Sequence, residues 1–178
     1  TTLFRSGQLI IGNGVTFSSN KNTRINFVIS GDVSIQSTAA DLSNCTLRLT
    51  GQNQNLSAVK TSLRSLLVDG QPNATVALTG EWDILQKLQL NNGIIIPNPN
   101  SSKLLYSGTD QPNGNDSSYV NGIFYSQGND FLNFPIGNDD GYFPAVLNNV
   151  TSRSAVGLQV IKGDVQFITS SEITEVMN

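Results

Sequence analysis

The stretch LRSLLVDGQPNATVALTGEWDILQKLQLNNGIIIP, residues 63–97, decides the fold class that the sequence predicts. Short apolar runs (LRSLLV, ATVAL, WDILQKLQL and GIII) alternate there with corners rich in Gly, Asn, Asp and Pro. Runs of this length between such corners are typical of β-strands. The same pattern of apolar runs and polar corners extends from Gln8 to about Tyr106, and apolar residues alternate at Cys45, Leu47 and Leu49. The sequence therefore predicts an all-β protein.

The spacing of the runs favours a parallel β-helix, also called a β-solenoid. The runs follow one another too closely, and their corners are too short, for strands joined by helical crossovers. In a solenoid, coils of about 20–25 residues each contribute two or three short strands, and stacked coils bury a shared core. We expect such a solenoid over residues 1–107, with an antiparallel β-sandwich as the alternative fold.

One segment of the expected solenoid is ambiguous. Leu56, Val59 and Leu63 fall at helical spacing, and Asn55 is a residue type that caps helices. A strand near residues 63–68 is the preferred interpretation, because short apolar runs also suit strands. A helix over Leu56–Val68 is the alternative.

The pattern of short apolar runs stops after Tyr106. The segment SGTDQPNGNDSS, residues 107–118, has no large apolar residue and several turn dipeptides, which predicts a linker over residues 108–117. Aromatic-rich runs separated by Gly and Asn follow it. They predict a small antiparallel capping β-domain over residues 118–178, because the end of a solenoid exposes apolar core and unpaired strand edges.

Composition excludes several classes of protein. Only 13% of the residues are charged, and 10 Lys and Arg against 13 Asp and Glu give a net charge of −3. A nucleic-acid partner is not expected, because such binding needs a basic footprint. Membrane insertion is not expected either, because no apolar run approaches the roughly 18 residues that span a bilayer. The chain starts without Met or a signal peptide, as a piece excised from a longer protein would.

Catalytic and cofactor motifs are absent from the sequence. The chain has no His and one Cys, so Ser–His and Cys–His triads and ordinary zinc sites lack their parts. We expect Cys45 to be a small buried apolar residue. The sequence predicts no cofactor and no enzyme.

Two groups of acids are weak candidates for chemistry. Glu81 and Asp83 flank Trp82 on one face of a strand, an arrangement that a carbohydrate-active β-helix enzyme could use. The simpler interpretation is two solvated acids around a core Trp. Asn138, Asp139 and Asp140 in GNDDG offer oxygen ligands for Ca²⁺, although a turn held by its own side chains is the preferred interpretation.

The segment 118–144 is rich in aromatics and carries a resemblance. Together with the repeats of residues 63–97, the motifs SSYVNG (117–122), FPIG (134–137) and GYFPAVL (141–147) resemble the β-helical stalk regions of large secreted surface proteins of the Bacteroidetes. The resemblance implies a secreted or cell-surface bacterial protein exported by type IX secretion, with other parts of a larger surface protein or complex as its partners.

The resemblance implies a non-enzymatic stalk or adhesin-type module. The aromatic block 119–143 then caps the end of the solenoid and joins it to the following strands. In the alternative interpretation the block binds glycans or surface proteins. The residues predicted to cap or bind are Tyr119, Asn121, Gly122, Tyr125, Phe134, Pro135, Gly137, Tyr142, Phe143 and Pro144.

Overall fold

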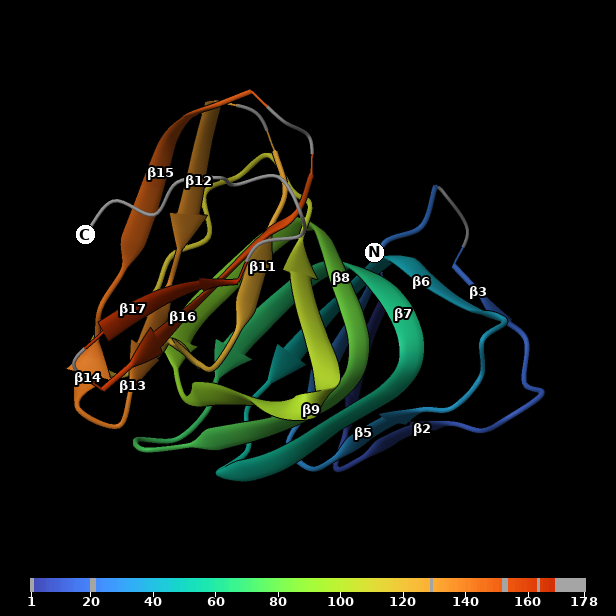
Figure 1. The fold of residues 1–178 in the computed structure, drawn as a ribbon. Coiled ribbons are helices and arrows are strands. Elements are labelled where there is room, and N and C mark those ends of the chain that lie inside the picture. Colours follow the sequence, from blue (N-terminus) through green and yellow to red (C-terminus); the bar gives the residue numbers. More distant parts are fainter. Residues whose placement is uncertain (1, 20–21, 129, 152–153, 163, 169–178) are drawn as a thin grey trace.

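The computed structural model describes residues 2–19, 22–128, 130–151, 154–162 and 164–168. Within these ranges the chain is all β-strand and turn, and about six turns of parallel strands stack into a β-solenoid. Figure 1 shows the coils following one another from the blue N-terminal strands to β9, with the orange and red strands at the opposite end. The predicted all-β solenoid is confirmed, and the antiparallel sandwich is excluded.

The strands are β1 (Thr2–Ser6), β2 (Leu9–Ile11), β3 (Phe17–Ser18), β4 (Ile25–Ile29), β5 (Val33–Ile35), β6 (Ala40–Leu49), β7 (Asn53–Asp69), β8 (Thr75–Asn92), β9 (Ile94–Tyr106), β10 (Val120–Asn121), β11 (Phe124–Ser126), β12 (Asp130–Phe134), β13 (Ile136–Asn138), β14 (Gly141–Tyr142), β15 (Ala145–Val150), β16 (Val156–Ile161) and β17 (Asp164–Ile168).

Each coil contributes to three faces. The first face contains β2, β5 and the opening parts of β7, β8 and β9. The second face contains β3, the start of β6, the middles of β7 and β8, and the end of β9. The third face contains β1, β4 and the ends of β6, β7 and β8. The three faces enclose the core.

The register places like residues above one another. Phe4, Phe27, Leu47, Leu66 and Leu88 occupy one position in five successive coils, 19 to 23 residues apart. The last four are buried. Apolar columns of this kind explain why the coils share a pattern of apolar positions but not the same residues. Any apolar side chain that fills the space in the column can occupy the position.

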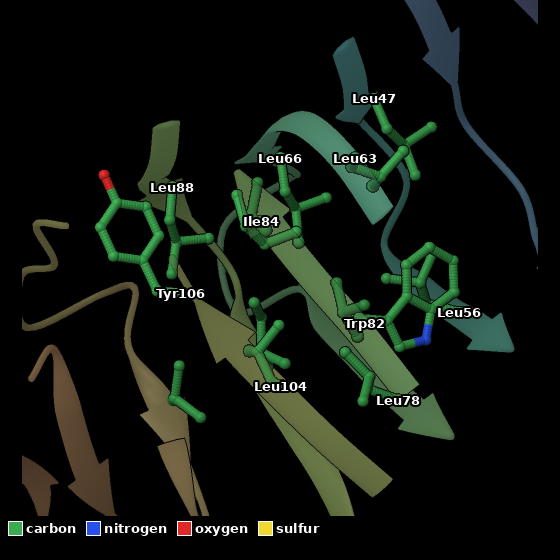
Figure 2. Packing of buried hydrophobic residues seen from close by; sticks show 14 of the residues in the cluster. Leu47, Leu56, Leu63, Leu66, Leu78, Trp82, Ile84, Leu88, Leu104 and Tyr106 are labelled. Atoms are coloured by element: carbon green, nitrogen blue, oxygen red, sulfur yellow. The ribbon is translucent and has the colours of Figure 1, made fainter. Parts of the chain in front are cut away.

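The second face carries a column that contains the Trp of the chain. Trp82 pairs in register with Leu104, and Leu104 with Phe124 of β11. Figure 2 shows Trp82 beside Leu56 and Leu78 in the interior, with Leu104 on the next coil. All five of these side chains are no more than 1% exposed.

The ambiguous segment Leu56–Val68 is strand throughout, so the helix alternative is excluded. It belongs to the 17-residue β7, which crosses all three faces and shifts register between Ser57 and Lys60 and between Leu63 and Ser65. The helical spacing of its leucines arises at these corners, because each bend resets which side chains point inward. Val59 lies on such a corner and is 56% exposed.

A buried amide ties together one corner of the solenoid. Gln54 is 3% exposed and stands in the apolar column of Val76 on the first face. Its Oε1 accepts a hydrogen bond from the Gly51 N–H at 2.8 Å, and its Nε2 donates to the carbonyls of Ile29 (3.2 Å) and Gly31. The side chain therefore satisfies three backbone groups of two neighbouring coils.

We expect Gln54→Leu to lower the free energy of unfolding by about 2–3 kcal/mol, because it removes the amide that pairs with the Gly51 N–H and the Gly31 carbonyl, whereas the Ile29 carbonyl keeps Thr50 as a donor. Urea denaturation measures the effect. Gln52→Leu is the matched control, because Gln52 is exposed at the same corner. Equal stabilities of the two variants would contradict the role of Gln54.

Parallel stacking extends beyond residue 107. Strand β10 pairs with β9 at Val120 and Ile95, β11 pairs with β9, and β13 pairs with β10. Within the predicted linker, Asn113 forms a parallel bridge with Gln89. Segments on both sides of the predicted linker therefore supply backbone edges that continue the parallel coils.

Antiparallel structure is confined to the end of the described chain. Strand β16 pairs with β11 and β17 with β16, while β14 pairs with β13. Strands β12 and β15 form a separate two-stranded sheet beside them (Figure 1). Residues 129, 152–153, 163 and 169–178 of the predicted capping domain lie outside the described residues.

Candidate functional site

The aromatic block 119–143 points mainly into the protein. The Tyr119 and Tyr142 rings stack with centroids 6.2 Å apart, and the Tyr119 hydroxyl donates to the Asn138 carbonyl at 2.8 Å. Phe124 and Phe134 meet edge to face at 6.2 Å and are fully buried. Tyr119, Phe124 and Phe134 are buried at the end of the solenoid, whereas Tyr142 is half-buried.

Tyr125 is half-buried and held from two sides. The Lys103 ammonium lies 5.5 Å from the centre of its ring. On the other side the ring covers Gly157, where an added Cβ would come within 2.7 Å of it. The predicted residue therefore packs across the junction between β9, β11 and β16.

The Gly and Pro positions of the block are mostly structural. Gly122, Pro135 and Gly137 are buried, whereas Pro144 is exposed. A Cβ on Gly137 would lie 2.2 Å from the Gly141 carbonyl oxygen, so only glycine allows this close approach. Asn121 donates to the Asp139 carboxylate at 2.8 Å and connects β10 to the GNDDG turn.

Two aromatic side chains of the block remain exposed. Phe131 is 41% exposed and Phe143 is 47% exposed. Phe143 was among the residues predicted to cap or bind, whereas Phe131 belonged to the predicted aromatic block without being assigned that role. Alternation along β12 would have identified Phe131, because Leu132 and Phe134 are buried on either side of Asn133.

A hollow of about 630 Å³ lies beside Phe131. It is bounded by the loop 107–112 and by the turn from β11 into β12. Thr109, Gln111 and Asn133 contribute hydroxyl and amide groups to its wall, and Asp110 is its one charged residue among those described. An exposed ring beside neutral hydrogen-bonding groups is suited to a sugar ring, which has an apolar face and hydroxyls at its edge.

The loop over this hollow is held in place by hydrogen bonds. The Tyr106 hydroxyl lies between two carbonyl acceptors, that of Gln86 at 2.7 Å and that of Asp110, which share its single proton. Burial, with a smaller contribution from the charge of Asp110, raises the pKa of Tyr106 to about 12, so the hydroxyl keeps its proton. Asn133 Nδ2 donates to the Pro112 carbonyl at 2.7 Å and fixes the other end.

The GNDDG oxygens are engaged within the protein. Asn138 Oδ1 accepts from the Asp140 N–H at 2.8 Å, as in a turn stabilised by its own side chain. Asp139 accepts from Asn121, and Asp140 lies 3.7 Å from the Lys162 ammonium. Within the described residues no three His, Cys, Asp or Glu side chains are placed to hold a metal ion.

Glu81 and Asp83 each have their own partner on the second face. The Glu81 carboxylate lies 3.5 Å from the Lys60 ammonium, and Glu81 also stands in register with Lys103. Asp83 Oδ1 accepts from the Ser107 hydroxyl at 2.7 Å. Trp82 between them is buried in the core, as the simpler interpretation expected.

Cys45 is fully buried in the core, as predicted. Burial raises the pKa of its thiol from 9.0 to about 11. Between these values the folded chain keeps a proton that the unfolded chain has lost, so stability falls as the pH rises from about 9 to 11.

We therefore expect Cys45→Ala to show a smaller loss of stability than the parent chain over this pH range. Urea denaturation of each protein at both ends of the range measures the difference. The stability that the variant loses through its smaller side chain is the same at both pH values, so it cancels when each protein is compared with itself. Parallel pH dependences of the two proteins would contradict the raised pKa of Cys45.

No helix among the described residues has the length and apolarity to cross a membrane. Comparisons with models of protein families, with functionally characterised proteins and with solved structures found no match to this chain.

Proposed function

We propose that this chain is a non-enzymatic structural module, of the stalk or adhesin type, in a secreted protein of a bacterial cell surface. The observation that carries the proposal is the stack of about six turns of parallel strands around a largely apolar interior. Such a stack maintains length and direction without a catalytic cleft, which is what a stalk requires. The resemblance of residues 117–147 to stalk regions of type IX secretion substrates supports the surface location.

The two ends of the solenoid differ in a way that supports this role. At the β1 end the apolar side chains of Leu3, Phe4, Ile10 and Val15 are each about half exposed or more. The opposite end is covered by antiparallel strands. An open edge with apolar residues is a surface on which further β-structure stacks, so other parts of a larger surface protein or complex are the proposed partners.

Antibodies raised against the chain test the location. They should label intact cells of the organism that encodes it, and protease added outside the cells should remove the labelling. Labelling that appears only after lysis would overturn the proposal. Incubation with polysaccharides tests the non-enzymatic part, because cleavage that Glu81→Gln or Asp83→Asn abolishes would replace it with the enzyme alternative.

Binding of neutral glycans at the hollow beside Phe131 is a second candidate function. It is favoured by the exposed ring next to Thr109, Gln111 and Asn133. Phe131→Ala should weaken binding to a responding glycan about tenfold, through loss of ring contact. Phe143→Ala is the matched control, because Phe143 is an exposed Phe of the same block that does not line the hollow. Equal affinities of the two variants would reject this candidate.

A further inference from the structure

A second hollow, of about 380 Å³, lies on the outer side of the third face. Three cationic side chains line it: Arg24, which precedes β4, Arg64 of β7 and Lys87 of β8. Asp110 is the one acid among its described lining residues. Three of the ten Lys and Arg of an acidic chain therefore meet in one groove.

These three cations have no ion-pair partner among the described residues. Elsewhere on the surface cations do pair, as Arg48 does with Asp69, Lys60 with Glu81 and Lys162 with Asp140. Like charges that share a concave surface repel one another and produce a positive potential that attracts anions. The groove is thus a basic site on a protein whose net charge is negative.

Arg64 is oriented before any ligand arrives. Its Nε donates to Gln86 Oε1, and its two Nη groups have no partner among the described residues. A guanidinium fixed through Nε presents a planar pair of donors, the geometry that suits carboxylate and sulfate oxygens.

The groove runs along the axis of the solenoid. Asn26, Thr46, Ser65 and Lys87 stand in register on four successive strands. Because neighbouring strands are about 4.8 Å apart, Arg24 and Arg64 are separated along the axis by roughly 10 Å, and Lys87 lies one strand further. A row of cations at this spacing fits an extended ligand with repeating anionic groups.

We propose that this groove binds an acidic polysaccharide, with uronate or sulfate groups on Arg24, Arg64 and Lys87. Asn26, Thr46 and Gln86 line the same groove and offer hydrogen bonds to sugar hydroxyls. A single-stranded nucleic acid fits less well, because none of the groove's described residues is an aromatic on which bases could stack. The proposal is independent of the stalk function and of the hollow beside Phe131.

Calorimetric titration of the chain with oligogalacturonate and with heparin oligosaccharides at low salt tests the proposal. Arg64→Gln/Lys87→Gln should weaken binding about tenfold, as expected from losing two charged contacts. Lys60→Gln/Lys103→Gln is the matched control, because it removes the same charge from the second face. This control should keep its affinity within about twofold.

Lys87→Glu alone provides a second readout that leaves the Arg64–Gln86 contact in place, and it should also weaken binding. The proposal is overturned if neither polyanion binds, or if both double variants lose affinity equally. It is also overturned if a single-stranded oligonucleotide binds as tightly as the acidic glycans, because the groove would then be a general polyanion surface.

Discussion

Trp82→Ala should lower the free energy of unfolding by about 3–5 kcal/mol, the usual cost of removing a buried large aromatic side chain. Trp82 is 1% exposed and is the only Trp of the chain. Its ring stands in the column between Thr61 and Leu104, and its Nε1–H donates to the Thr79 carbonyl at 2.9 Å. The substitution leaves a cavity in the middle coil and a carbonyl without its donor.

Urea denaturation followed by circular dichroism measures this loss, since the variant has no Trp fluorescence. Leu85→Ala is the control, because Leu85 lies on the same strand and is 38% exposed. We expect the control to lose less than about 1.5 kcal/mol. Trp82→Phe should fall between the two. A Trp82→Ala variant as stable as the control would show that the second-face column can collapse around the gap.

The fold class could be predicted because a solenoid requires short alternating apolar runs and turn residues, which are visible in the local sequence. Cys45, Leu47 and Leu49 alternate on β6, and all three are buried. The corners are less predictable, because a coil can bend within a continuous strand. Thus β8 runs through three faces from Thr75 to Asn92, where the sequence suggested separate runs.

Polar residues inside the core could not be found from the sequence. In the sequence Gln54 belongs to a polar corner, yet in the structure it lies in an apolar column. Its amide forms hydrogen bonds there with backbone groups of two coils. The extension of parallel stacking beyond residue 107 was missed for a related reason. Asn113 in the linker contributes only backbone to its bridge with Gln89, so its side-chain type carries no signal.

The candidate binding surfaces could not be predicted from the sequence either. The cations Arg24, Arg64 and Lys87 are 40 and 23 residues apart in the chain, and only the coil register brings them to one groove. Conversely, the aromatics of the block 118–144 were expected to cap the solenoid, with recognition as the alternative, and only the structure shows that Tyr119, Phe124 and Phe134 are buried. Aromatic content alone does not distinguish a cap from a binding patch.

Gly80→Ala should lower the free energy of unfolding by about 3–5 kcal/mol, because it combines backbone strain with a collision. Gly80 has φ +81° at the bend of β8 between the first and second faces. A Cβ there would lie 1.6 Å from the Ala58 carbonyl oxygen of the preceding coil. Relief requires the two coils to separate, because the obstacle is backbone and not a flexible side chain.

Gly14→Ala is the matched control for this collision. Gly14 has φ +76°, nearly the same conformation, and an added Cβ would meet no atom within 4 Å. Its substitution therefore has only the cost of a left-handed conformation, about 1–2 kcal/mol. The difference between the two variants in urea denaturation isolates the contact between coils. Equal losses would mean that the stack separates readily at Gly80, which a module that maintains length and direction could not allow.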